Sequence, residues 1–161
     1  MAGEEAKLRT FNVTSKDAAA YGYEKPEAMQ NQVTVADALY VLHKAMYGDA
    51  FDENQSKYLN VSSNGWINTM FENTTGNFGY YVNNKYPADE NGKGTVANTT
   101  VLKSGDTLSL CVLADTTGYT DEYIYFENVP EEISNLAEGQ QLDIAKDLKP
   151  SLVYYDENDK Q

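Results

Sequence analysis

Hydrophobic and polar residues alternate most regularly in the segment TVADALYVLHKAMYG, residues 34–48. Hydrophobic side chains recur there at the spacing of one helical face, at Val35, Ala38, Leu39, Leu42 and Met46. Thr34 can cap the N-terminus, Asp37 follows it at the spacing of a weak capping box, and Gly48 is a natural C-terminal stop. The segment therefore predicts a helix with one apolar face, which should pack on a sheet.

Shorter runs rich in β-branched and aromatic residues predict strands. These runs cover residues 7–15, 66–73, 77–86, 107–113 and 120–129. Between the first run and the helix, residues 16–32 predict a loop with a short helical turn, because Gly22 and Pro26 interrupt a polar stretch. One helix and several strands indicate the α+β class, with a mainly antiparallel sheet.

Turn residues separate the later strands. Asn83 and Asn84 tolerate left-handed backbone, and residues 89–94 and 104–106 combine Gly with Asp or Asn. After Pro130, residues 140–148 and 151–156 are again strand-like. We expect residues 128–161 to form a β-rich tail, which either begins a following module or packs as an edge on the preceding domain.

The charge balance excludes some classes of partner. The net charge is −13, so the chain repels phosphate backbones and anionic lipid surfaces. No apolar run is long enough to span a bilayer, and the first residues lack the basic and apolar regions of a signal peptide. We therefore expect neither nucleic-acid binding nor membrane insertion.

The aromatic residues are mostly tyrosine, with 13 Tyr against 5 Phe and 1 Trp. Exposed strand positions are the ordinary place for so many tyrosines, because their rings suit a half-buried sheet. In the strand around NFGYYVNNKY, alternate side chains face opposite ways, Phe78, Tyr80 and Val82 on one side and Gly79, Tyr81 and Asn83 on the other. We expect one set to pack under the helix, against Leu39 and Leu42.

The other set gives the candidate ligand-binding residues. With Trp66 and Tyr86 nearby, Tyr81 and Asn83 can form an exposed aromatic shelf, on which a sugar or a planar cofactor would stack. The alternative is that protein covers both faces of the strand. The predicted ligand-binding residues are thus Trp66, Tyr81, Asn83 and Tyr86.

Residues with catalytic or metal-binding potential are few. His43 is the only histidine, and we expect it at the border of the apolar helix face in contact with solvent. Cys111 is the only cysteine, and it lies in an apolar strand with no basic neighbour to activate it. The acidic segment at residues 89–94 lacks the full ligand spacing of a calcium loop and predicts an ordinary turn. We therefore expect no catalytic residues and no metal site.

Three segments together resemble the transcobalamin C-terminal-like domain family of bacterial surface and secreted proteins. They are TVADAL at residues 34–39, YYVN at residues 80–83, and the Gly105-Asp106 turn before an apolar strand. The resemblance covers residues 7–127 and departs from the family at Phe78 or Gly79, where the family has Trp, and at Asn84, where it has Gly. It implies a β-grasp-like fold, a small sheet around one helix, and cobalamin as a possible ligand by analogy alone.

The function expected from these observations is a non-catalytic, extracellular binding module for a small molecule, glycan or protein. The resemblance implies a cell-surface or secreted bacterial protein with neighbouring domains in a longer chain. Two alternatives remain open: a structural spacer of a multidomain adhesin, and a cobalamin- or tetrapyrrole-binding domain. A third reading, an enzyme, would need His43 or Cys111 in a cleft beside a carboxylate.

Overall fold

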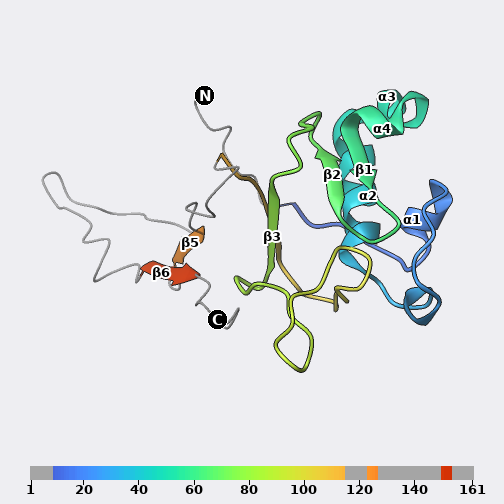
Figure 1. Cartoon of the computed structure of the whole chain (residues 1–161). Helices are drawn as coiled ribbons and strands as arrows, with labels where there is room; N and C mark the ends of the chain where they lie inside the picture. The colour runs from blue at the N-terminus through green and yellow to red at the C-terminus, as the bar shows by residue number, and fades with distance from the viewer. Residues whose placement is uncertain (1–8, 115–122, 127–149, 154–161) are drawn as a thin grey trace, which may run out of the picture. The chain divides into compact units, whose positions relative to one another are not determined.

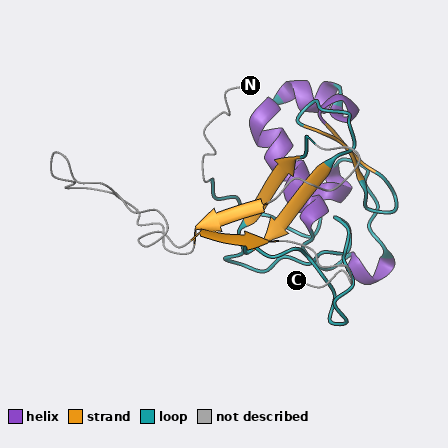
Figure 2. Cartoon of the chain, turned by 60° about the vertical axis from the view of Figure 1, so that its left-hand side comes forward, coloured by secondary structure: helices purple, strands orange, loops and turns teal. Residues whose placement is uncertain are grey.

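The structure is a computed structural model that describes residues 9–114, 123–126 and 150–153. Helices and short strands are mixed, so the α+β class is confirmed (Figure 1). The helices are α1 (Asp17–Ala20), η1 (Glu27–Met29), α2 (Val35–Tyr47), α3 (Asp49–Glu53) and α4 (Gln55–Tyr58). The strands are β1 (Leu59–Val61), β2 (Ile67–Met70), β3 (Phe78–Val82), β4 (Leu108–Val112), β5 (Tyr123–Phe126) and β6 (Pro150–Val153). Long loops connect these elements (Figure 2).

The chain divides into two compact units. The first comprises Met1–Phe78 and Thr95–Asp106, and the second comprises Gly79–Gly94 and Thr107–Gln161. The helices, β1 and β2 belong to the first unit. The described strands pair two by two, as β1 with β2, β3 with β4, and β5 with β6.

The long helix α2 begins where the sequence predicts. Asp37 accepts hydrogen bonds from the backbone N–H of Thr34 at 2.9 Å and from its hydroxyl at 3.0 Å, which confirms the predicted capping pair. The next two backbone N–H groups bind carbonyls that are distant in sequence. Val35 N–H donates to the carbonyl of Thr100, and Ala36 N–H donates to that of Ala97. The helix start is thus held by long-range contacts as well as by its own cap.

The buried face of α2 differs from the predicted one. Leu39 and His43 are completely buried, whereas Met46 is 45 % exposed and Leu42 is half-buried. The prediction that His43 contacts solvent is therefore wrong. His43 lies one turn after Leu39, so it continues the same face, and β1 lies against this helix (Figure 1).

Aromatic rings fill much of the core beside α2. Tyr40 stacks on Tyr21 with ring centroids 5.5 Å apart, and Phe51 is completely buried beside both rings. Burial raises the pKa of Tyr40 to about 12, because the ionised phenolate would lose its water. In the first unit, Tyr23, Tyr40 and Tyr58 are core residues, so the expectation of tyrosines at exposed strand positions is wrong there.

Strands β1 and β2 form an antiparallel pair, in which Leu59 is opposite Met70 and Val61 is opposite Ile67. In β1 the exposed Asn60 lies between two buried residues, whereas in β2 Thr69 and Met70 are both buried. The pairing shifts register between Asn60 and Val61, so period-two alternation is interrupted there. The predicted strand at residues 66–73 is confirmed over its middle part. It ends at Met70 because Phe71 and Glu72 both have positive φ angles, 55° and 62°, and turn the chain back.

The second unit contains the predicted turn and three predicted strands, since β5 also lies within the segment expected to be a strand at residues 120–129. Strands β3 and β4 lie within the segments expected to be strands, and they pair with each other. Asn83 and Asn84 have φ angles of 52° and 61°, which confirms the left-handed turn. Strands β5 and β6 are antiparallel, with Tyr123 opposite Val153.

The first predicted strand is wrong. Residues 9–14 are not in a strand and have no ladder partner among the described residues, although the backbone runs without a helical turn. The helical turn expected in residues 16–32 is confirmed by α1 and η1. The boundary expected between residues 127 and 128, and the strand expected at 140–148, lie outside the described residues. The packing of the β3 side chains under α2 stays a prediction.

Candidate functional site

Trp66 is the exposed aromatic residue of the first unit. Its side chain is 67 % exposed, although indole is among the largest apolar groups in proteins. It precedes β2, where Ile67 points inward and is buried, so alternation directs Trp66 outward. The structure therefore agrees with the exposure that the sequence predicts for this residue.

Hydrogen bonds fix the loop that carries Trp66. Ser62 donates its backbone N–H to the carbonyl of Trp66 at 2.8 Å, and its hydroxyl accepts the Trp66 N–H at 3.0 Å. The hydroxyl of Tyr23 donates to the carbonyl of Ser62 at 2.8 Å. The loop is thus closed on itself and attached to a core tyrosine, so the backbone that carries the indole is held at a defined place.

Gly65 makes this loop geometry possible. Its φ angle is 83°, and a Cβ atom there would lie 2.2 Å from Oδ1 of Asn98. Asn98 is buried and donates its side-chain amide to the carbonyl of Ser63 at 3.0 Å. Only glycine combines the left-handed backbone with so close an approach.

Two outward amides on the hairpin were not predicted from the sequence. Asn60 on β1 and Asn68 on β2 are exposed, and Nδ2 of Asn68 donates to Oδ1 of Asn60 at 3.0 Å. The signal that identifies them is the alternation in Trp66, Ile67 and Asn68, since residues two apart share a face. Asn68 therefore lies on the same side of β2 as Trp66.

The other three predicted residues lie in the second unit. The rings of Tyr81 and Tyr86 meet edge to face with centroids 6.4 Å apart. Asn83 has a structural role, because its backbone N–H donates to the carbonyl of Thr107 and its Oδ1 accepts the Thr107 N–H at 2.9 Å. The structure thus brings Tyr81 and Tyr86 together; a shelf shared with Trp66 stays a prediction.

His43 is fully engaged inside the first unit. Its Nδ1 is 2.8 Å from the carbonyl of Leu39, and its Nε2 is 3.2 Å from the N–H of Phe71. This pattern requires the neutral tautomer, with the proton on Nδ1. Burial lowers the pKa of His43, and its ring stacks on that of Phe71 at 4.8 Å. Neither nitrogen is available to a metal or a substrate.

A buried ion pair lies beside the start of α2. Nζ of Lys25 is 2.6 Å from Oδ2 of Asp37, and both side chains are almost completely buried. Lys25 also donates to the carbonyls of Ser15 and Gln32, so all its donors are used. Asp37 also accepts the N–H of Ala18 at 3.1 Å. These two charges hold loops around the helix, and neither is free for chemistry.

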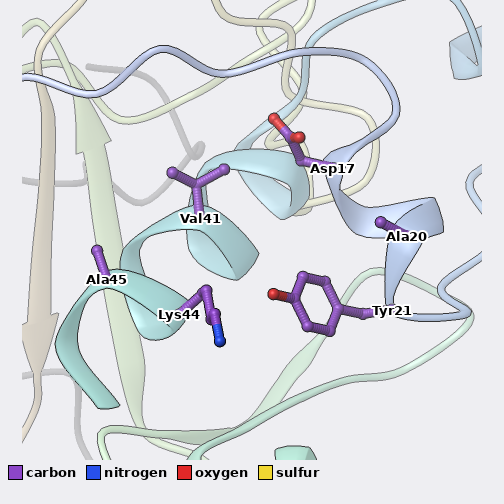
Figure 3. A pocket seen from close by; sticks show the side chains of 6 residues that line it. All are labelled: Asp17, Ala20, Tyr21, Val41, Lys44 and Ala45. Atoms are coloured by element: carbon purple, nitrogen blue, oxygen red, sulfur yellow. The ribbon is translucent and has the colours of Figure 1, made fainter. Parts of the chain in front are cut away.

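A shallow hollow of about 390 Å³ lies between α1 and α2 (Figure 3). Its lining residues are Asp17, Ala20, Tyr21, Val41, Lys44 and Ala45. Lys44 contacts the carboxylate of Asp52 at 2.6 Å, and this hydrogen bond raises its pKa. The positive charge of Lys44 is thus neutralised within the protein. The hollow includes none of the predicted ligand-binding residues.

The expectations for Cys111 and for the acidic turn concern the second unit. Cys111 is half-buried, and its Sγ lies 3.5 Å from the carbonyl of Gly79. Oδ1 of Asp89 accepts the N–H groups of Asn91 and Lys93, at 2.8 and 3.0 Å, so this segment is an ordinary turn as predicted.

Within the described ranges, no three His, Cys, Asp or Glu side chains are grouped so as to hold a metal ion. Among the same residues, no helix has the length and apolar character needed to cross a membrane. A comparison with protein-family models, with curated proteins and with solved structures finds no match to this chain. The transcobalamin-like resemblance stays an expectation, and the arguments below rest on the site itself.

Proposed function

We propose that the chain is a non-catalytic module that binds a ligand or partner through Trp66 and the surface around it. The observation that carries this proposal is the 67 % exposure of an indole on a loop fixed by hydrogen bonds. A rigid aromatic side chain costs little conformational entropy when it binds, and it offers a large contact area. Exposed aromatic residues of this kind are enriched at binding surfaces.

The engagement of His43 supports a non-catalytic role. It is the only histidine in the sequence, and both ring nitrogens are occupied by backbone groups. A histidine-assisted serine or cysteine nucleophile would need one of those nitrogens as a base. The same contacts leave no histidine of this chain to coordinate a cobalt ion.

The finer fold and setting belong to the same proposal. The capped helix α2 and the Asn83-Asn84 turn support a β-grasp-like domain of the transcobalamin C-terminal-like kind. The resemblance supports a place in a cell-surface or secreted bacterial protein, next to other domains. Tyr81 and Tyr86 form an aromatic pair within the second unit, which we propose as a separate candidate contact.

The test is a binding screen read by the fluorescence of Trp66. Because Trp66 is the only tryptophan, any change in indole emission reports on this site. The screen contains cobalamin, haem, neutral and acidic oligosaccharides, and peptides, with hits measured by titration calorimetry. Trp66→Ala should weaken binding of a true ligand about tenfold or more, which corresponds to about 1.4 kcal/mol.

Met46→Ala is the matched control, because Met46 is also an exposed apolar residue, 45 % accessible, but lies on α2. It should leave the affinity unchanged. Ligands that bind equally to Trp66→Ala and to the parent chain would contradict the proposal. A complete absence of ligands would favour the structural-spacer alternative.

A further inference from the structure

The outward face of the β1–β2 hairpin places an indole and two amides together. Asn60 and Asn68 point away from the core because their neighbours Leu59, Val61 and Ile67 are buried. Trp66 precedes Asn68 by two residues and lies on the same side. Trp66 stands directly before β2, and extended residues two apart are separated by about 7 Å, while Asn60 contacts Asn68 across the register shift of the hairpin. The indole and the amides can therefore contact one small ligand.

The two amides are held in a fixed relation. Nδ2 of Asn68 donates to Oδ1 of Asn60 at 3.0 Å, which orients both carboxamide groups. Nδ2 of Asn60 and Oδ1 of Asn68 then remain for a ligand, as one donor group and one acceptor. If both amides were turned over, the face would still offer one donor group and one acceptor, so this property does not depend on their assignment.

The hairpin itself has no charged residue between Lys57 and Glu72. The nearest charged groups on the hairpin and its flanks are Lys57 and Glu72, which pair with each other at 2.8 Å. They flank the end of the hairpin where Leu59 is opposite Met70, away from the Ser62–Trp66 loop. Residues 58–71 carry no charged side chain, so an ionic ligand would find no counter-charge on the strands or loop of the hairpin itself, whereas an uncharged polar ligand needs none.

We infer that this face, made of Trp66, Asn68 and Asn60, binds a sugar ring of a neutral oligosaccharide. A pyranose ring has a flat face of C–H groups, which stacks on the indole, and hydroxyl groups at its edge, which both donate and accept hydrogen bonds. It therefore matches the apolar platform and the amide pair together. The inference rests on the proposed function, since it names the ligand class of the same site.

The rigid loop favours this ligand class energetically. Sugars bind proteins weakly because their hydroxyl groups must give up water, so little affinity is left to order a flexible site. Here Ser62 and Tyr23 fix the loop, and Gly65 packs against Asn98, before any ligand arrives. The site thus adds little ordering cost of its own.

The experiment titrates the full chain with cellohexaose, maltohexaose and N-acetylchitohexaose, using Trp66 emission and calorimetry. At least one of these neutral hexasaccharides should change the emission and release heat. Trp66→Ala should weaken that affinity about tenfold or more, Trp66→Phe should weaken it less, and Asn68→Ala should weaken it severalfold. Met46→Ala is the control and should have no effect.

The outcomes separate this inference from the proposed function. Failure of all three hexasaccharides to bind, or binding that survives Trp66→Ala, overturns the inference. If a peptide or cofactor from the screen binds in a Trp66-dependent way while no neutral sugar does, the saccharide assignment is wrong and the binding module stands. If no ligand of any class depends on Trp66, both fail. Circular dichroism of each variant checks that the fold is retained.

Discussion

At the scale of single residues, the contacts of His43 explain why a polar side chain is buried where the sequence predicts an exposed one. The polar side chain continues the apolar face of α2, and it does so because Leu39 and Phe71 supply backbone partners for both nitrogens. The sequence shows the position, one turn after Leu39, but not the partners. Since Phe71 is distant in sequence, a local pattern could only assign the histidine to the boundary of the helix face.

The lowered pKa of His43 predicts a loss of stability in mild acid. The unfolded chain takes up a proton near the ordinary pKa of 6.5, while the folded chain resists it. Stability therefore falls as the pH drops below about 6.5, by at most about 1.4 kcal/mol per pH unit for this group. Urea unfolding between about pH 7.5 and about pH 5.5 measures the slope.

His43→Gln is the control for this slope, because glutamine stays neutral throughout. Its stability should depend less on pH across the same interval than that of the parent chain. The single histidine also gives one imidazole signal in a proton NMR titration, with a midpoint below 6.5. A midpoint above 6.5 would contradict the burial argument.

The ion pair of Lys25 and Asp37 gives the second prediction at this scale. Asp37→Asn keeps the shape of the side chain but leaves the buried ammonium of Lys25 without its counter-charge. We expect the free energy of unfolding to fall by about 3–5 kcal/mol, measured by urea denaturation. The comparison is Lys57→Gln, which breaks an exposed pair with Glu72 and should change the unfolding midpoint very little.

At the scale of elements, short turns decide where the strands end. The sequence predicts the Asn83-Asn84 turn correctly, because Asn tolerates the left-handed region. It does not predict the same geometry at Phe71 and Glu72, whose side chains disfavour positive φ. There the backbone conformation follows from tertiary contacts, in which His43 accepts the Phe71 N–H and stacks on its ring.

This strained turn predicts a stabilising substitution. Glu72→Gly removes the side chain that disfavours a φ angle of 62°, and it should raise the free energy of unfolding by about 1 kcal/mol. The variant also loses the exposed ion pair with Lys57, so Lys57→Gln measures that loss separately. Phe71→Gly should have the opposite sign, because it also removes the ring against His43. The unfolding temperatures of the three variants, measured by thermal unfolding, should decrease in the order Glu72→Gly, Lys57→Gln, Phe71→Gly.

Strand pairing explains the error at residues 7–15. Alternation of exposure is visible there, since Phe11 and Val13 are half-buried and Asn12 and Thr14 are exposed. Such alternation predicts extended backbone, but a strand also needs a partner, and partners are not local in sequence. The helix α2 depends on a local period and a local cap, which is why its limits are predicted closely.

At the scale of the whole molecule, the sequence predicts the fold class more securely than it predicts which distant segments meet. The α+β class follows from the separate patterns of helix and strands, whereas the division into two units depends on which distant segments meet. The candidate site shows the same limit. Trp66 is found from its type and place, but the amide pair beside it depends on the pairing of β1 with β2.

The net charge of −13 predicts a response to salt. Like charges repel more in the compact state than in the unfolded chain, so screening should stabilise the fold. The unfolding temperature should rise when NaCl increases from about 10 mM to about 150 mM, where the Debye length falls to about 8 Å. Calorimetric scans measure this shift. A falling unfolding temperature would show that attractive ion pairs outweigh the repulsion.

The segment Thr95–Asp106 returns to the first unit after the chain has passed through the second. It supplies the carbonyls of Ala97 and Thr100 to the first amides of α2, and Asn98 to the loop of Trp66. A fragment that stops at Phe78 would therefore lack part of its own fold. Adding a synthetic peptide of residues 95–106 should rescue it by fragment complementation, and the helix and the tryptophan loop should then form together.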